Sequence, residues 1–411
     1  MRINRLHTLL LALVALLSVA SCGEDRTYEY LEKTEENQWT YSKMKEVYYW
    51  AGEMKQPERS VFFSATTKFF SSLLSKSDKV SFFTDSVIIG SYGLEFALMR
   101  DPLGEKPNRY YAVALYVEPG SPAALAGVGR GTWISGINGK ALTSASGNLL
   151  LSGEGMEVIT SHVDYDDENG KYFWTNGDTL AVQASATFDS KAIYIDSVYN
   201  VRSSKVGYVA CRNLSGSSFE TDIQEIMLGF AAENVTDIVV DLRYCSEGAL
   251  ENANAVASAL VPVSLAGTPF ATLCDKDGNT GNGYDFTEQP VNLSDKRVFF
   301  ITGKGTKGAA ELLVASVNAS RGMHEVIVVG EKSAGGKMQT ARFDSPYGFS
   351  INPAGAVICA SDGNELPDTG IAPDFLINEL EEGKRIYPLG NEQEYILRNI
   401  EYYIVNGSLP E

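Results

Sequence analysis

The segment TDIVVDLRYCSEGALENANAVASALVP, residues 236–262, contains the pattern that decides the fold of this chain. Its first part, TDIVVDLRY, is a short apolar run rich in β-branched residues, which is typical of a buried strand. The part from Gly248 to Pro262 has apolar residues at helical spacing between a glycine and a proline, so it predicts a helix. A strand followed directly by a helix is the repeating unit of an α/β layer.

The same alternation extends from about residue 200 to residue 380. Further strands are predicted at 206–214, 297–303 and 325–330, and further helices at 219–235 and 308–320. The first of these helices is amphipathic, with an inward face made of Phe219, Ile223, Ile226, Met227 and Phe230. Residues 349–374 return to β structure. We therefore expect one α/β domain with a mixed sheet over residues 196–411.

Residues 86–195 have a different sequence pattern, which predicts short strands with alternating apolar residues, separated by Gly, Pro and Asp. In the stretch 110–142 a strand ends at Glu118, Ser121 begins a short helix, and Asn138-Gly139 forms a hairpin turn. This order resembles a PDZ domain, with an insertion at 164–178. The resemblance implies that Gly93, Leu94, Glu95 and Phe96 bind the C-terminus of a peptide that adds a strand to the sheet.

The N-terminus has the features of an export signal. Arg2 and Arg5 precede the apolar run LLLALVALLSVA, and small residues then lead to Cys22, which resembles a bacterial lipobox. We expect a signal peptide at 1–21, a lipidated polar tether at 22–36 and a helical domain at 37–85. The mature protein would be a membrane-anchored lipoprotein of the cell envelope, in the periplasm, at the outer membrane or on the cell surface.

Composition excludes several kinds of function. The net charge of −18 becomes −20 once Arg2 and Arg5 are removed with the signal peptide, so nucleic acid is not expected as a partner. Only His162 and His324 remain after processing, which argues against a histidine base or a metal site built from several histidines. We expect no cofactor and no metal. The remaining cysteines lack zinc-site spacing and are expected to be buried apolar residues: Cys211, Cys245, Cys274 and Cys359.

Several motifs between residues 39 and 374 together resemble the tail-specific, or C-terminal-processing, serine peptidases. They are the N-terminal helices rich in Trp and Tyr, the PDZ-like module, and the stretches DLRY, GTKGAAE, GEKSAGGKMQ and GIAPD. The resemblance implies an α/β and β multi-domain fold. It also implies a serine nucleophile activated by a lysine of lowered pKa, and backbone N–H groups that stabilise the oxyanion, without any histidine.

The residues of that mechanism are only partly present. The position of the nucleophile, three residues before Glu311, is occupied by Gly308, which has no side chain to attack a carbonyl. Lys337 is the natural match for the base, one residue later than the family motif places it, and the family glutamine either corresponds to Gln339 or is absent. The resemblance assigns the oxyanion donors to the backbone of Gly248 and Ala309. Beside them, Glu247 brings a negative charge that opposes a developing oxyanion.

Three functional hypotheses follow. The leading one is a degenerate peptidase that binds polypeptide segments or C-termini. The second is an active serine-type endopeptidase with Lys337 as its base and a relocated nucleophile, for which Thr306, Ser333 and Cys245 are the candidates. The third is a structural lipoprotein that docks a partner in an envelope complex. The sequence leaves open whether the protein is an enzyme, and it does not predict the oligomeric state.

Overall fold

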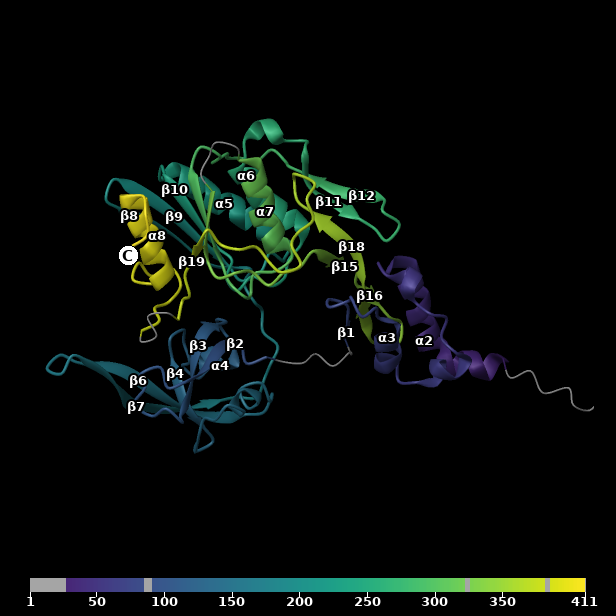
Figure 1. Cartoon of the computed structure of the whole chain (residues 1–411), viewed down its shortest axis with the longest axis horizontal. Coiled ribbons are helices and arrows are strands. Elements are labelled where there is room, and N and C mark those ends of the chain that lie inside the picture. The colour runs from purple at the N-terminus through teal and green to yellow at the C-terminus, as the bar shows by residue number, and fades with distance from the viewer. Residues whose placement is uncertain (1–26, 85–90, 322–325, 381–384, 411) are drawn as a thin grey trace, which may run out of the picture. The chain divides into compact units, whose positions relative to one another are not determined.

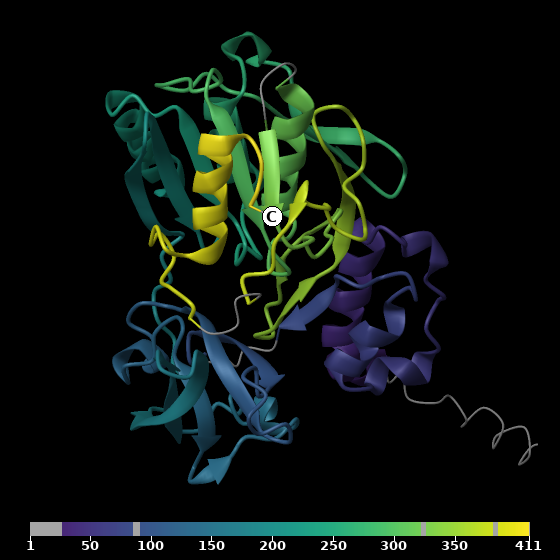
Figure 2. The same cartoon turned by 60° about the vertical axis from the view of Figure 1, so that its left-hand side comes forward.

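The computed structural model describes residues 27–84, 91–321, 326–380 and 385–410, and the chain forms two compact units (Figures 1 and 2). One unit contains the residues up to Thr84 together with 342–353, and the other contains the remainder. The predicted signal peptide and lipidation residue Cys22 lie outside the described residues. No helix in the described part of the chain is long and apolar enough to cross a membrane.

The first unit is a small helical domain closed by three short strands. Its helices are α2 (Thr27–Val47) and α3 (Thr66–Leu73), with 3₁₀ turns η1 (Ala51–Glu53) and η2 (Arg59–Phe63) between them. The predicted tether at 22–36 is therefore helical from Thr27 onward, because TYEYLEKTEENQ contains no Gly or Pro and many good helix formers. Its core consists of aromatic and long apolar side chains: Met44, Tyr48, Phe62, Phe69, Phe70 and Leu73.

A late segment of the chain completes this unit. Strand β1 (Phe82–Thr84) pairs antiparallel with β17 (Ser350–Asn352), which pairs with β16 (Phe343–Asp344). Phe349 lies over the ring of Phe83, 5.0 Å between centroids. The sequence assigned residues 342–353 to the α/β domain, but this pairing places the hairpin in the helical unit.

The second unit begins with a β module. Its sheet has the order β2-β3-β4-β6-β7. The strands are β2 (Leu94–Arg100), β3 (Tyr110–Val117), β4 (Trp133–Ile137), β5 (Lys140–Ala141), β6 (Met156–Asp166) and β7 (Lys171–Val182). The predicted short helix is α4 (Pro122–Leu125), capped by the Ser121 hydroxyl, and a 3₁₀ turn η3 spans Ser146–Asn148. The insertion extends the β6–β7 hairpin. Asn138 and Gly139 both have positive φ, as a two-residue hairpin turn requires.

The α/β domain is built on a six-stranded mixed sheet in the order β19-β14-β13-β10-β9-β8, and so the expected fold class is confirmed. The strands are β8 (Ile193–Val201), β9 (Ser204–Cys211), β10 (Asp237–Asp241), β13 (Arg297–Thr302), β14 (Val326–Gly330) and β19 (Phe375–Leu376). Strand β8 is antiparallel to β9, and the other pairs are parallel.

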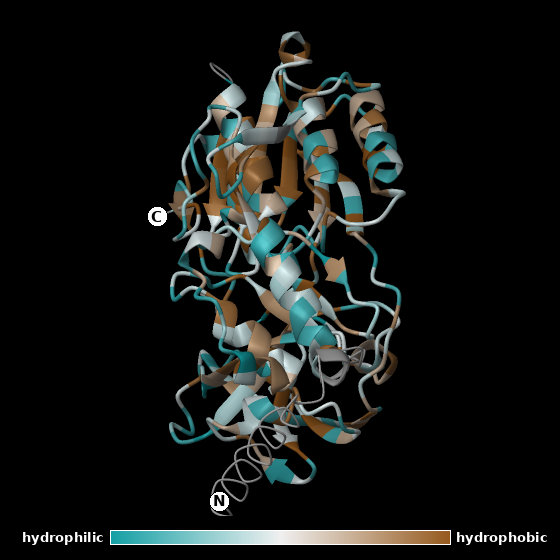
Figure 3. Cartoon of the chain, turned by 90° about the vertical axis from the view of Figure 1, so that its right-hand side faces the viewer, coloured by the Kyte–Doolittle hydropathy of each residue, from teal (hydrophilic) through white to brown (hydrophobic). Residues whose placement is uncertain are grey.

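Helices cover both faces of this sheet (Figures 1 and 2). Helices α5 (Phe219–Ala232), α6 (Leu250–Leu260) and α7 (Ala309–Ser320) bury apolar side chains against one face, and α8 (Tyr395–Asn406) covers the other. The central strands are mainly hydrophobic, whereas the helices are mixed (Figure 3). Of the predicted inward face of α5, only Ile226 is not fully buried.

A second sheet, in the order β12-β11-β18-β15, extends the α/β domain. Its strands are β11 (Pro269–Cys274), β12 (Thr280–Asp285), β15 (Met338–Thr340) and β18 (Ala354–Cys359), and a 3₁₀ turn η4 (Val263–Leu265) leads into it. The chain therefore passes from β14 through a loop at 331–337 into this second sheet, which fixes where that loop ends.

Candidate active site

Three loops meet at the carboxyl ends of adjacent parallel strands, which is where α/β folds place their sites. They follow β10, β13 and β14. The Lys307 N–H donates to the Cys245 carbonyl at 3.0 Å, and the Ala334 N–H donates to the Thr306 carbonyl at 2.9 Å. These bonds bring together the three motifs that the sequence singled out, DLRYCSEG, GTKGAAE and GEKSAGG.

Gly308 is the residue that begins helix α7. Its φ of 60° and ψ of −111° lie in a region that side chains rarely adopt. The Gly308 N–H donates to the Glu311 carboxylate at 3.0 Å, which satisfies one free donor of the helix start. A Cβ added at Gly308 would meet nothing within 4 Å. The position of the expected nucleophile therefore faces open space and has no reactive group.

The residue that faces Gly308 is Gly336. A Cβ added there would lie 2.9 Å from the Gly308 nitrogen, 3.0 Å from Lys307 Cγ and 3.1 Å from Glu311 Oε2. Because side chains alternate in extended backbone, the next residue, Lys337, projects elsewhere. Both positions at which a serine–lysine pair would meet are therefore glycine.

Lys337 lies in an acidic setting that does not suit a general base. Its ammonium contacts Glu365 at 3.1 Å and Asp368 at 3.2 Å. The hydrogen bond to Glu365, aided by that to Asp368, raises the pKa of Lys337 above its ordinary value. A catalytic lysine needs the opposite shift, so these contacts do not support Lys337 as the base.

The candidate relocated nucleophiles are all engaged. The Thr306 hydroxyl donates to the Leu242 carbonyl at 2.8 Å, and the Ser333 hydroxyl donates to the Glu311 carboxylate at 2.5 Å. Both side chains are buried. Cys245 is fully buried, and burial raises the pKa of its thiol well above the ordinary value, which opposes formation of a thiolate. Both hydroxyls are thus held in hydrogen bonds within the protein, and the thiol is held neutral by burial.

The expected oxyanion donors have different surroundings. The loop around Gly248 is paired with Leu214, because the Leu214 N–H donates to the Glu247 carbonyl and the Ala249 N–H donates to the Leu214 carbonyl, both at 2.9 Å. Ala309 is the first residue of α7, where N–H groups lack a partner within the helix. Glu247 is exposed.

Gln339 lies outside this cluster of loops. It belongs to β15, where it pairs with Ala356 of β18 in the second sheet. The geometry therefore does not support Gln339 as the family glutamine.

Comparison with known proteins identifies the family. A model of peptidase family S41 matches residues 205–377, and a model of the S41 N-terminal domain matches residues 35–82. The chain belongs to peptidase family S41. No curated protein sequence gives a significant match.

Solved structures of S41 proteins share this fold. A Bacteroides fragilis protein assigned to the S41 proteases has a TM-score of 0.76 and 24% identity, over 90% of this chain and 97% of its own. The photosystem II D1 C-terminal processing protease has a TM-score of 0.53 and 16% identity, over 84% of this chain and 93% of its own. At these identities the likeness concerns the fold.

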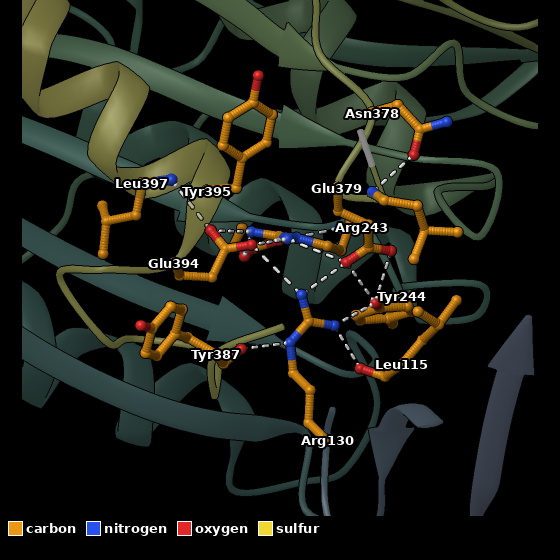
Figure 4. Close-up of polar contacts among 12 residues, drawn as sticks. Leu115, Arg130, Arg243, Tyr244, Asn378, Glu379, Tyr387, Glu394, Tyr395 and Leu397 are labelled. Carbon is orange, nitrogen blue, oxygen red and sulfur yellow. Dashed lines mark hydrogen bonds and ion pairs between the residues drawn. The ribbon is translucent and has the colours of Figure 1, made fainter. Parts of the chain in front are cut away.

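In this S41 protein a buried charge cluster links the β module to the loop after β10 (Figure 4). Arg130 of the module contacts Glu379 at 2.7 Å and Glu394 at 3.3 Å, and it donates to the Tyr244 hydroxyl at 2.7 Å. Arg243 contacts the same two glutamates, at 3.2 and 2.7 Å. This cluster is not predictable from the sequence, because residues 249 positions apart give no spacing signal.

The cluster determines the charge state of its carboxylates. Burial alone would raise the pKa of Glu394, but the neighbouring Arg243 and Arg130 outweigh burial and lower it to about 2. Burial and the two arginines act on Glu379 in the same way, and its pKa is also lowered. The loop that carries Tyr244 is therefore held by permanent charges rather than by groups that titrate near neutral pH.

The predicted peptide-binding residues lie beside this cluster. Gly93 precedes β2, which is an edge strand of the module sheet, and Leu94, Glu95 and Phe96 begin it. A cleft of about 250 Å³ runs between β2 and the turn after β13, and its lining includes Glu95, Phe96 and residues 302–305. Glu95 is paired with Arg212 at 2.8 Å. The open edge of β2 thus lies next to the cluster of loops.

Proposed function

We propose that this protein is a lipid-anchored envelope member of family S41 that binds polypeptide segments or C-termini without hydrolysing them. The observation that carries the proposal is the contact between Gly308 and Gly336, where a serine–lysine pair would require two side chains. The backbones are so close that even a Cβ at Gly336 would clash with the Gly308 nitrogen. This close approach supports the proposal, because it leaves no room for a base side chain at Gly336 in addition to the missing nucleophile at Gly308.

Peptide binding is supported by the features that remain. Among the described residues strand β2 pairs on one side only, with β3, and added strands bind through main-chain hydrogen bonds that need no catalytic residue. Gly93 has a φ of +67°, and a Cβ there would lie 2.2 Å from Ser121 Cβ. Only glycine therefore allows the loop before β2 its present conformation, in which the backbone approaches Ser121 and the start of α4.

The first test measures binding of peptides with a free C-terminal carboxylate and of the same peptides amidated. A random peptide library supplies the probes, because the ligand is unidentified. We expect the free-carboxylate peptides to bind more tightly. We also expect Gly93→Ala to weaken their binding by about tenfold or more, since the loop must shift. Absence of any binding, or equal binding of both peptide forms, would refute the C-terminus proposal.

Gly104→Ala is the matched control. Gly104 also has a positive φ, +73°, but a Cβ there would meet nothing within 4 Å. Both substitutions introduce the same backbone strain into the β module, and only Gly93→Ala adds a collision next to β2. An equal loss of affinity in the two variants would show that the module merely unfolds.

A second arm tests the endopeptidase alternative with an unstructured protein substrate. We expect no cleavage by the purified mature protein. If cleavage occurs and is lost in Lys337→Ala and in one of Thr306→Ala, Ser333→Ala or Cys245→Ala, the proposal of an inactive site is wrong. Cleavage that survives all four substitutions identifies a contaminating protease.

The anchor is tested separately. The lipobox-like sequence before Cys22 supports membrane attachment through an acylated thiol. We expect the full chain to sediment with membranes and Cys22→Ser to appear in the soluble fraction. Membrane attachment that is unchanged in Cys22→Ser would contradict a lipid anchor at this residue.

A further inference from the structure

A groove lies along the edge of the α/β sheet that β8 forms, at the other end of the sheet from β19. Strand β8 is the last strand of that sheet and pairs only with β9 in the described part of the chain (Figure 1). A hollow of about 1030 Å³ runs beside β8 and is lined by β8, helix α5 and the 213–218 loop. An edge strand with open space beside it presents unpaired N–H and C=O groups to another chain.

The groove has an apolar floor. The face of β8 that looks toward α5 presents Ile193 and Val198, which pack against the core together with Ile226 and Phe230 of α5. Phe230 is fully buried, and the other three are partly exposed in the groove. The floor therefore offers apolar contact along the strand edge without itself forming a large exposed patch.

The rim of the groove is acidic. Asp196, Asp222, Glu225 and Glu233 line it, and Lys191 is its one basic residue. Glu233 is already paired with Lys205 at 2.8 Å. The other three carboxylates form no ion pair within the described ranges of the chain, and all three are exposed. Their charge is available to a cationic group that enters the groove.

Gly229, in the last turn of α5, keeps the groove open on the helix side. A glycine inside a helix costs about 1 kcal/mol relative to alanine. Packing within the chain does not require it here, because a Cβ at Gly229 would meet nothing within 4 Å. Gly229 lies four residues after Glu225 and four before Glu233, on the helix face that lines the hollow.

We propose that this groove binds an extended polypeptide segment with Lys or Arg at alternate positions, as a strand added to β8. Alternate residues of an added strand point to one face, so its basic side chains would all lie on the α5 side. Their aliphatic stems would cover Val198 and Ile226, and their charged ends would reach Asp222 and Glu225. A second copy of this chain is a poor occupant, since its net charge is −18.

The test uses a ten-residue peptide of alternating lysine and valine, acetylated and amidated at its ends. Because the ends are blocked, recognition of a C-terminal carboxylate beside β2 does not contribute, and the groove variants described next separate binding at β8 from strand addition at β2, so failure here leaves the test of C-terminus binding untouched. We expect the peptide to bind the full mature chain with an affinity that falls as salt is added. We expect no binding of the matching glutamate–valine peptide, nor of the lysine peptide with N-methyl groups on alternate residues.

Two variants locate the site. Asp196→Asn/Asp222→Asn/Glu225→Gln should weaken binding by about tenfold, which equals about 1.4 kcal/mol. Its control, Glu105→Gln/Glu220→Gln/Glu288→Gln, removes the same charge from exposed positions that do not line the groove. Gly229→Leu should block binding by filling the groove, while the better helix former leaves the fold at least as stable. Its control is Ala232→Leu, at an exposed position of the same helix.

The results that overturn the proposal are specific. Equal losses in the two charge variants would mean that the peptide responds only to the net charge of the protein. Full binding by Gly229→Leu would place the peptide elsewhere. No binding by the unmodified protein would mean that Asp196 instead guards the edge strand against pairing, a known use of charge at sheet edges.

Discussion

Replacement of Arg130 by methionine tests whether the buried charge cluster holds the β module on the α/β domain. Arg130 donates to five acceptors, which are the carbonyls of Leu115 and Tyr387, the Tyr244 hydroxyl and two carboxylates. Its side chain is only 5% exposed. Methionine fills a similar volume and leaves all five acceptors without this donor.

The expected loss of stability follows from the charges that remain. Arg130 and Arg243 face the carboxylates of Asp241, Glu379 and Glu394. Without Arg130, three buried carboxylates share one guanidinium. Removing one partner of a buried ion pair costs about 3–5 kcal/mol, so we expect a loss in that range. Arg130→Lys should recover only part of it, because an ammonium lacks the planar set of donors.

The assay is urea unfolding followed by tryptophan fluorescence, with limited proteolysis of the β module as a second readout. Lys304→Met is the control in the same unit, because Lys304 is 81% exposed in its pair with Glu331 and should contribute less than about 1 kcal/mol. A loss in Arg130→Met as small as that of the control would refute the reasoning.

The pH dependence gives an independent check. The pKa of Glu394 in the folded state is about 2, against an ordinary 4.5, so its contribution is complete above pH 4.5 and disappears as the pH falls toward 2. In Arg130→Met the pKa values of Glu379 and Glu394 rise toward the ordinary value. The difference in stability between the variant and the original protein should therefore shrink as the pH falls through this range.

Three further predictions concern other sites. Burial, with the nearby Glu392, raises the pKa of Glu401 to about 7, so between pH 4.5 and pH 7 the folded state holds a proton that the unfolded state releases. The free energy of unfolding should therefore fall as the pH rises from 4.5 to 7. In thermal unfolding, Glu401→Gln should show a weaker dependence on pH over this range. Gly207→Ala should destabilise the protein by about 1–3 kcal/mol in urea titrations, because its Cβ would lie 2.8 Å from the Phe230 ring, whereas Gly281→Ala, with nothing within 4 Å, should not. Gly308→Ser should show no hydrolysis of an unstructured substrate, and any turnover would mean that a base is present after all.

The fold was largely predictable because the local sequence of most elements favours the structure that those elements adopt. The run TDIVVDLRY and its neighbours have the length and apolar content of central parallel strands, and the structure places them there as β10, β13 and β14. The hairpin at 342–353 was not predictable, since its pairing partner β1 lies more than 250 residues earlier and no local pattern records that contact. The polar composition of residues 22–36 predicts a tether, so the sequence does not indicate the helix that begins at Thr27.

The candidate site also has features that the sequence predicts and features that it does not. Gly308 could be located because it stands at a fixed distance from Glu311 within a single turn. The base position could not be assigned securely, because a shift of one residue in extended backbone reverses the direction of the side chain. The sequence therefore favoured the nearest lysine, Lys337, and only the geometry places Gly336 opposite Gly308. The Arg130 cluster depends entirely on contacts between distant segments.

The two glycines bear on whether a serine–lysine pair could be restored. A serine restored at Gly308 would enter open space, but a lysine restored at Gly336 would collide with the Gly308 nitrogen and Lys307. The buried Glu311 carboxylate, meanwhile, binds the Gly308 and Gly335 N–H groups at 3.0 and 2.8 Å and so fastens the two turns to each other. Recovery of a base thus requires these turns to separate. This closed arrangement supports the proposal that the protein binds polypeptide without cutting it, because a bound segment would meet neither a nucleophile at Gly308 nor a base at Gly336.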